Sequence, residues 1–357
     1  MNATQTLHQL GQRIWLDNIT RTLLRSGTLA RYIRELSVTG LTSNPTIFEH
    51  AIGSSDSYDA SIRALVETGL SGEDLFFELA IEDLTEAADL FLPDFEASDG
   101  DDGWVSLEVS PLLADNTAHT IEAANRLYAK VDRRNLFIKI PGTPQGVAAI
   151  EEVIFDGVPV NVTLLFSREH MLAAAEAYMR GIERRLEAGL DPRVASVLSL
   201  FVSRWDVAAK QVVAAPLHNR LGTAIAMRTY KAHHDLLASE RWQRLAAAGA
   251  RPQRLLWAST GTKDPAEPDT YYVQALAAPG TINTLPEKTL LAFADHGQVD
   301  GPLPVDGGHA EEVIESFRGE GIDDDELAAR LQREGVDAFA NSWHALLLRI
   351  RQKCART

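Results

Sequence analysis

Short apolar runs alternate with longer segments of helical periodicity along almost the whole chain. The runs are rich in β-branched residues and are bounded by turn-forming residues, which is typical of strands. The predicted strands are residues 14–18, 38–44, 104–110, 135–141, 158–166, 194–202, 254–260 and 281–285. This pattern predicts an α/β fold.

Segments with a helical period fill the spaces between these strands. One helix is predicted in each of the segments 117–131 and 168–190, and two or three helices are predicted in 206–250. From about residue 307 onward, further helices are expected to pack on the structure that the strands form. Eight strands alternating with helices predict a (β/α)8 TIM barrel with extra helices, built as one domain of residues 1–357. A doubly wound open sheet is the alternative, although it usually has fewer strands and no GxGxxG follows a strand here.

Six of the strands have one apolar face and one face that carries a polar side chain near the end of the strand. These polar residues are Asp17, Asn44, Glu108, Lys139, Asn161, Thr163 and Ser199. The apolar faces suit the surrounding helices, so the polar faces should point toward the barrel axis at the C-terminal ends, where such barrels hold their active sites. A buried ion pair that only fills the barrel is the alternative, but it requires six strands to place polar groups at one end by chance.

The charge balance limits the possible partners. The chain has 357 residues, with 34 Lys plus Arg and 50 Asp plus Glu, so its formal net charge is −16. Nucleic acid is bound by basic surfaces and is therefore not expected as the main partner, whereas a small phosphorylated ligand needs only a few local cations. Two acidic stretches, residues 94–103 and 320–326, are expected as exposed loops, because neither has the ligand spacing of a calcium loop.

The cysteine content and the hydropathy indicate the compartment. The single cysteine, Cys354, excludes an intrachain disulfide and a thiolate metal cluster. The first residues have no apolar signal-peptide core, and no apolar run approaches the ~18 residues that span a bilayer. We therefore expect a cytoplasmic protein without a membrane partner.

Lysine is scarce, which makes its placement informative. Only 7 of the 34 basic residues are lysines, and Lys139 lies within an apolar strand. Burial favours the neutral amine of a lysine, and a free amine facing a cavity attacks a ketone to form a Schiff base. The iminium is an electron sink that allows a neighbouring carbon–carbon bond to break. Asp17 and Glu108 would move the protons, and the amides and hydroxyls nearby suit a polyol.

Two cations lie beyond the ends of later strands. The segment 258–265 (ASTGTKDP) combines small residues with Lys263, and the loops after strands seven and eight of such barrels often bind phosphate. Arg204 follows the sixth strand. Either cation alone is usually solvated surface, but together with the inward carboxylates they suggest a phosphosugar.

Seven segments, in order along nearly the whole chain, give the sequence a family resemblance. They are TSNPTIF (42–48), SLEVSP (106–111) followed by ADNT (114–117), FIKIPGTPQG (137–146), VNVTLLFS (160–167), SLFVSRWD (199–206), WASTGTKDP (257–265) and TINTLP (281–286). The chain resembles the transaldolases, of the longer bacterial type. TSNPT, IKIPGT and NVTLLFS together make the resemblance specific.

The resemblance implies a class I Schiff-base enzyme that needs no metal or organic cofactor. Such an enzyme transfers a dihydroxyacetone unit from sedoheptulose 7-phosphate or fructose 6-phosphate to erythrose 4-phosphate or glyceraldehyde 3-phosphate. This is a reaction of the non-oxidative pentose phosphate pathway. Small sugar phosphates are then the partners, and a monomer or homodimer is expected.

The resemblance also implies roles for single residues. Lys139 matches the Schiff-base lysine and Asp17 the acid/base aspartate, while Glu108 and Thr163 match residues that position a water around the carbinolamine. The residues matching those that hold the hydroxyls of the three-carbon unit are Asn44, Asn161 and Ser199.

Three further positions concern specificity. Phe201 matches a position that is Phe in transaldolases and Tyr in the related fructose-6-phosphate aldolases. Arg204 matches a phosphate-binding arginine. Lys263 stands in the loop where shorter bacterial transaldolases have an Arg, and a lysine binds phosphate as a point charge rather than bidentately.

Three other functions remain as alternatives. An aldolase that releases free dihydroxyacetone is the nearest, but the apolar ring of Phe201 offers no phenol to protonate the enamine. A metal-dependent sugar-phosphate isomerase would need clustered ligands, whereas the ten histidines lie mostly in helical or loop segments without an HExxH. A non-catalytic sugar-phosphate-binding barrel would not need a buried lysine beside two carboxylates.

Overall fold

Eight parallel strands close into a barrel in the computed structural model, which describes residues 2–355. Each strand pairs with the next along the chain, and β1 pairs with β8 to complete the ring. The strands are β1 Arg13–Asp17, β2 Val38–Thr42, β3 Trp104–Glu108, β4 Leu136–Pro141, β5 Val160–Leu165, β6 Ser196–Phe201, β7 Arg254–Ala258 and β8 Ile282–Leu285. The predicted (β/α)8 barrel and all of its strands are confirmed.

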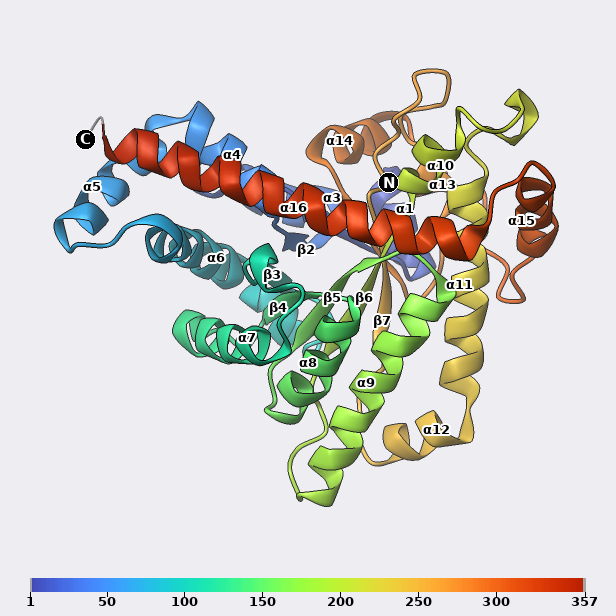
Figure 1. Ribbon diagram of the computed structural model, residues 1–357, viewed down its shortest axis with the longest axis horizontal. Coiled ribbons are helices and arrows are strands. Elements are labelled where there is room, and N and C mark those ends of the chain that lie inside the picture. The colour runs from blue at the N-terminus through green and yellow to red at the C-terminus, as the bar shows by residue number, and fades with distance from the viewer. Residues whose placement is uncertain (1, 356–357) are drawn as a thin grey trace.

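Helices surround the barrel and follow the strands (Figure 1). The bounds of the first eight helices are α1 Ala3–Leu10, α2 Arg21–Arg25, α3 Thr28–Leu36, α4 Pro45–Ser54, α5 Asp59–Glu67, α6 Gly72–Ala97, α7 Thr117–Val131 and α8 Pro144–Phe155. Those of the others are α9 Arg168–Glu187, α10 Ser203–Ala209, α11 Leu221–Ala238, α12 Glu240–Ala247, α13 Tyr271–Ala275, α14 Glu287–His296, α15 Ala310–Gly319 and α16 Asp324–Cys354. The helices predicted in 117–131, 168–190 and 206–250 are therefore confirmed.

Side-chain caps start several helices soon after a strand ends. Asn44, Thr143 and Ser167 each accept a hydrogen bond from a backbone N–H in the first turn of α4, α8 and α9. The chain therefore turns at fixed points at the C-terminal end of the barrel.

The strand register aligns the polar residues of the inner face. Glu108 on β3 pairs with Lys139 on β4, which pairs with Asn161 on β5. The opposite face of these strands is apolar and fully buried, with Ile138 and Val162 among its residues. Paired residues on adjacent parallel strands direct their side chains to the same face of the sheet, so these three polar side chains are neighbours on the inner face.

The end of β5 departs from strict alternation. Strict alternation would place Leu164 on the apolar face with Val160 and Val162. Instead, the pairing with β6 shifts between Val162 and Leu165, and Leu164 has a left-handed backbone with φ 58°. The Leu164 side chain instead approaches Gly335 of α16. A bulge of this kind re-aims side chains at the rim of a barrel.

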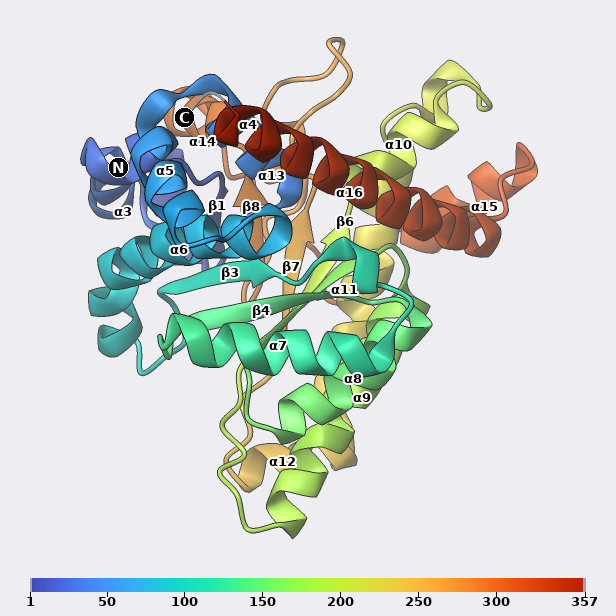
Figure 2. The same ribbon diagram turned by 60° about the vertical axis from the view of Figure 1, so that its left-hand side comes forward.

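The C-terminal helix α16 lies across one end of the barrel in both views (Figures 1 and 2). It packs on α4, α5 and α6. Near its start, Asp324 accepts a hydrogen bond from Arg228 of α11 at 2.6 Å, and near its end Lys353 forms an ion pair with Asp59 at 2.5 Å. The helices expected from about 307 are therefore present, and α16 is held near both of its ends by these contacts.

The two acidic stretches are only partly loops. Residues 94–97 form the end of α6, and Asp102 is buried in an ion pair with Arg13 at 2.6 Å. In the second stretch, α16 begins at Asp324, whose side chain is also buried. The expectation of exposed loops is wrong at these positions, because residues 94–97 continue a helix and because Asp102 and Asp324 are buried in ion pairs with arginines of other elements.

Among residues 2–355, no helix is long and apolar enough to cross a membrane.

Candidate active site

A cavity of ≈ 310 Å³ opens at the C-terminal end of the barrel, beneath α16. The sequence-predicted site residues in its lining are Asp17, Asn44, Lys139, Thr163, Ser199, Phe201, Arg204 and Lys263. The two others, Glu108 and Asn161, lie behind this lining and touch it through hydrogen bonds. The structure thus brings all the predicted site residues to one place.

Lys139 lies at the centre of the site, with only 5% of its surface exposed. Its Nζ donates hydrogen bonds to Oε2 of Glu108 at 3.1 Å and to the backbone oxygen of Ser43 at 3.2 Å. Burial raises the pKa of Glu108, the charge of Lys139 lowers it, and the charge of Asp17 raises it further. A proton that leaves the lysine therefore has an acceptor within hydrogen-bond distance.

Asp17 is the second carboxylate of the site. Its Oδ1 accepts a hydrogen bond from Oγ1 of Thr42 at 2.8 Å, and this hydroxyl also lies 2.8 Å from that of Thr284. Burial raises the pKa of Asp17, while the charge of Lys139 and the Thr42 hydrogen bond lower it. A raised pKa allows this carboxyl group to hold a proton closer to neutral pH than an exposed aspartate can.

A chain of neutral groups runs beside Lys139. Ser199 donates from Oγ to Oδ1 of Asn161 at 2.7 Å, and Nδ2 of Asn161 donates to Oγ of Ser106 at 3.2 Å. These bonds fix the orientation of the Asn161 amide. The chain leaves Ser199 in the wall of the cavity, where its oxygen can accept a hydrogen bond from a ligand.

Two buried oxygens of the site have no hydrogen-bond partner among residues 2–355. They are Oγ1 of Thr163 and Oε1 of Glu108. Buried polar atoms are normally satisfied by protein groups or by water, so these two atoms are suited to binding a water or a substrate hydroxyl.

Asn44 both caps helix α4 and lines the cavity. Its Oδ1 caps α4 by accepting from the N–H of Ile47 at 3.0 Å. The cap fixes the side chain and leaves the amide NH2 group as the donor for a ligand.

The two rim cations differ in their surroundings. Arg204, at the start of α10, is half-buried, and its guanidinium carbon lies 5.3 Å from the centre of the Phe201 ring. Burial lowers the pKa of Arg204. Lys263 is exposed in the loop after β7. Both line the same cavity and face an anion entering it.

Sequence reasoning missed the contribution of α16. Phe339 of this helix lines the cavity, and its ring centre lies 5.4 Å from Nζ of Lys139 and 6.5 Å from the ring of Phe201. The sequence signalled a C-terminal helix, but nothing in its apolar pattern indicated which of its residues meets the lysine.

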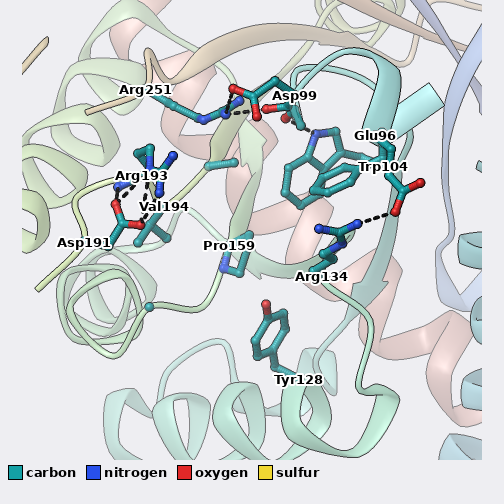
Figure 3. Close-up of a pocket in the computed structure, with 14 residues that line it drawn as sticks. Glu96, Asp99, Trp104, Tyr128, Arg134, Pro159, Asp191, Arg193, Val194 and Arg251 are labelled. Carbon is teal, nitrogen blue, oxygen red and sulfur yellow. Dashed lines mark hydrogen bonds and ion pairs between the residues drawn. The ribbon is translucent and has the colours of Figure 1, made fainter. Parts of the chain in front are cut away.

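A larger cavity, ≈ 510 Å³, lies at the opposite, N-terminal end of the barrel (Figure 3). Its arginines already have acidic partners within the same lining: Arg134 pairs with Glu96, Arg193 with Asp191 and Arg251 with Asp99. The close-up shows Asp191 with Arg193 on one side of Tyr128 and Pro159, Glu96 with Arg134 on the other, and Asp99 with Arg251 above them. The cavity holds neither a buried lysine nor an unpaired cation, so it does not compete with the first as a site for Schiff-base chemistry.

Within residues 2–355, no group of three or more His, Cys, Asp or Glu side chains is placed to hold a metal ion.

Fold and site together define a (β/α)8 barrel with a buried lysine between carboxylates at the catalytic end, the arrangement suited to Schiff-base chemistry on a carbonyl substrate. Residues 14–350 match the sequence model of the Transaldolase/Fructose-6-phosphate aldolase family. The chain belongs to this family.

Three relatives extend this similarity to nearly the full length. A protein named Transaldolase from Thermobifida fusca is 44% identical over 98% of both chains. Another of that name from Thiobacillus denitrificans is 45% identical over 98% of this chain and 100% of its own. A protein named Transaldolase 2 from Nostoc punctiforme is 40% identical over 99% of this chain and 97% of its own.

Proposed function

We propose that this chain is a transaldolase that works through a Schiff base on Lys139. It transfers a dihydroxyacetone unit from sedoheptulose 7-phosphate or fructose 6-phosphate to erythrose 4-phosphate or glyceraldehyde 3-phosphate, in the non-oxidative pentose phosphate pathway. The family and the named relatives of matching length support the activity. The observation that carries the mechanism is the buried Lys139, paired with Glu108 in a cavity that Asp17 also lines.

The first step forms the covalent bond to the donor. Lys139 passes a proton to Glu108, and the free amine adds to the C2 carbonyl of the ketose to give a carbinolamine. The carbinolamine then loses its hydroxyl as water, with Glu108 returning the proton, and an iminium remains. A water held by Oε1 of Glu108 and Oγ1 of Thr163, the two unsatisfied oxygens, would carry protons between the carboxylate and the carbinolamine.

The second step breaks the carbon chain. Asp17 takes the proton of the C4 hydroxyl, the C3–C4 bond breaks, and its electron pair moves into the iminium to give an enamine. The aldose phosphate leaves, and an acceptor aldose phosphate takes its place. The enamine attacks the new aldehyde, Asp17 returns its proton to the new hydroxyl, and water hydrolyses the iminium. The raised pKa of Asp17 suits a group that must both accept and donate this proton.

Polar and cationic residues orient the sugar during these steps. Asn44, Asn161 and Ser199 hold the hydroxyls of the three-carbon unit. Arg204 and Lys263 bind the phosphate at the rim. Holding the substrate at both ends places C2 against the lysine and C4 against the aspartate, which removes most of the orientational cost of the reaction. No step requires a metal or an organic cofactor.

An aldolase that releases free dihydroxyacetone is the second candidate, because the family description includes fructose-6-phosphate aldolase. Phe201 favours transfer, since its ring has no hydroxyl to protonate the enamine. The enamine is therefore kept until an acceptor aldehyde arrives.

The experiment that separates these functions is an assay of fructose 6-phosphate with and without erythrose 4-phosphate. A transaldolase forms sedoheptulose 7-phosphate and glyceraldehyde 3-phosphate together when the acceptor is present. Steady release of dihydroxyacetone without acceptor, at a rate equal to that of transfer, would contradict the proposal.

We further propose that residues 1–357 act as one domain in the cytoplasm, as a monomer or homodimer.

A further inference from the structure

The C-terminal helix presents three successive residues of one face to the mouth of the barrel. Gln332, Gly335 and Phe339 are spaced by three and four positions, so they lie on the same side of α16. All three are buried. Phe339 covers Lys139, whereas the other two contact the end of β5 and Arg204.

Arg204 depends on packing for its position. Its side chain forms no hydrogen bond and no ion pair with any of residues 2–355, although the charge of Glu334 on α16 acts on it at longer range. Most arginines of the chain, in contrast, are paired with a carboxylate. The ring of Phe201 lies 5.3 Å from its guanidinium carbon. Against it lies Gly335, where an added Cβ would be 3.2 Å from Nη1 of Arg204. An arginine held in this way keeps its donors free for an anion.

At Gly335, the backbone of α16 lies close to side chains of the barrel rim. A Cβ at this position would lie 2.9 Å from Cδ2 of Leu164, closer than side chains tolerate. Glycine lowers the stability of a helix interior relative to alanine, so a glycine in this helix needs a packing reason. The contacts to Leu164 and Arg204 supply that reason.

Gln332 fixes the surface against which Gly335 packs. Its Nε2 donates to the backbone oxygens of Leu164 at 3.0 Å and of Gly142 at 2.9 Å. These bonds hold the left-handed turn at Leu164, and with it the side chain that touches Gly335. The position of the helix and the shape of β5 are thus set by the same contacts.

We propose that Gly335 and Gln332 are positioning residues that keep the Arg204 guanidinium directed into the cavity, and that they thereby determine the preference for phosphorylated substrates. This inference rests on the proposed function, in which Arg204 binds the substrate phosphate. The helix then acts on specificity without touching the reacting carbons.

The test compares Gly335→Ala with Ala338→Ser, which adds one atom on the exposed side of the same helix. We expect Gly335→Ala to raise both the KM for fructose 6-phosphate and the inhibition constant of inorganic phosphate by about tenfold, since a charge-assisted hydrogen bond is weakened. Borohydride trapping of dihydroxyacetone, which has no phosphate, should remain within about twofold of the wild type, as the lysine is untouched. Ala338→Ser should match the wild type throughout.

A second variant keeps the test informative if the first folds poorly. Gln332→Met removes the two donors at nearly constant volume and should change phosphate affinity in the same direction. Equal loss of dihydroxyacetone trapping and phosphate affinity in both variants would overturn the inference, because it would indicate general damage. Unchanged phosphate affinity in both would also overturn it, provided that Arg204→Ala weakens phosphate binding. If Arg204→Ala has no effect either, the phosphate assignment of the proposed function fails.

Discussion

Nζ of Lys139 and Oε2 of Glu108 lie 3.1 Å apart on adjacent strands, and both side chains are almost fully buried. The register of β3 and β4 makes the contact, because the two residues are direct partners in the ladder. A buried charge pair of this kind is costly for a fold, and a proton moves easily between two such groups. The pair is therefore better explained by chemistry than by stability.

Glu108→Gln should slow transfer and leave the lysine in place. The amide keeps the size of the carboxylate but cannot accept the lysine proton, so kcat should fall by a factor of about 10²–10⁴. Steady-state transfer with fructose 6-phosphate and erythrose 4-phosphate measures this loss. The matched control is Glu151→Gln in α8, an outer-surface glutamate paired with Arg180, which should keep full activity. Equal kcat for Glu108→Gln and the wild type would contradict the proton-transfer role.

Asp17→Asn should stabilise the fold while it removes activity. Burial raises the pKa of Asp17, so the folded state binds a proton more tightly than the unfolded state does. The contribution of this group to the free energy of unfolding is therefore greatest at low pH. It falls as the pH rises from the ordinary pKa of an aspartate through the raised pKa of Asp17 in the folded state. The amide removes the cost of the buried charge, on the order of 1 kcal/mol, and can still accept from Thr42.

The prediction is checked by measuring the melting temperatures of Asp17→Asn and of the wild type between about pH 4 and pH 8, a range that begins near the ordinary pKa of an aspartate. The variant should gain most at the alkaline end and least at the acidic end. A lower melting temperature of the variant than of the wild type at about pH 8 would contradict the prediction.

Phe201→Tyr should convert part of the transfer activity into release of dihydroxyacetone. The new phenol would lie beside the enamine and could protonate it before an acceptor arrives. The measurement is the rate of dihydroxyacetone release from fructose 6-phosphate without acceptor, relative to the rate of transfer. The ratio should rise, and an unchanged or lower ratio would show that the ring does not control the fate of the enamine.

Arg204→Ala should weaken phosphate recognition more than Lys263→Ala. Arg204 is half-buried beside Phe201 and presents a planar donor group, whereas Lys263 is exposed to solvent and acts as a point charge. We expect the KM for fructose 6-phosphate to rise by about tenfold or more in the first variant and by about threefold in the second. The reverse order would assign the main phosphate contact to the loop after β7.

The alternation of polar and apolar residues was sufficient to predict the barrel and the inner face of the site. Asp17, Glu108 and Lys139 could be found because each is the one charged residue of its predicted strand and lies on the face opposite the continuous apolar one. Strand periodicity is informative here because the outer face of each strand packs against apolar helices, whereas the inner face lines a polar cavity at the C-terminal end of the barrel.

The sequence could not predict where strict periodicity fails or what covers the barrel. Leu164 leaves its expected face because of a bulge that Gln332 supports from a helix 168 residues further along the chain. Phe339 reads as an ordinary apolar position of an amphipathic helix. Such contacts depend on how α16 is placed by Arg228 and Lys353 at its two ends, which is a tertiary property.

Borohydride reduction in the presence of fructose 6-phosphate, followed by peptide mass spectrometry, would detect the Schiff base on Lys139 itself. We expect a reduced three-carbon adduct on the peptide that contains Lys139, and none in the Lys139→Ala variant. Lys263→Ala, which removes a lysine at the rim of the same cavity, should retain the adduct. Absence of any adduct in the wild type, or an adduct on another lysine, would contradict the mechanism.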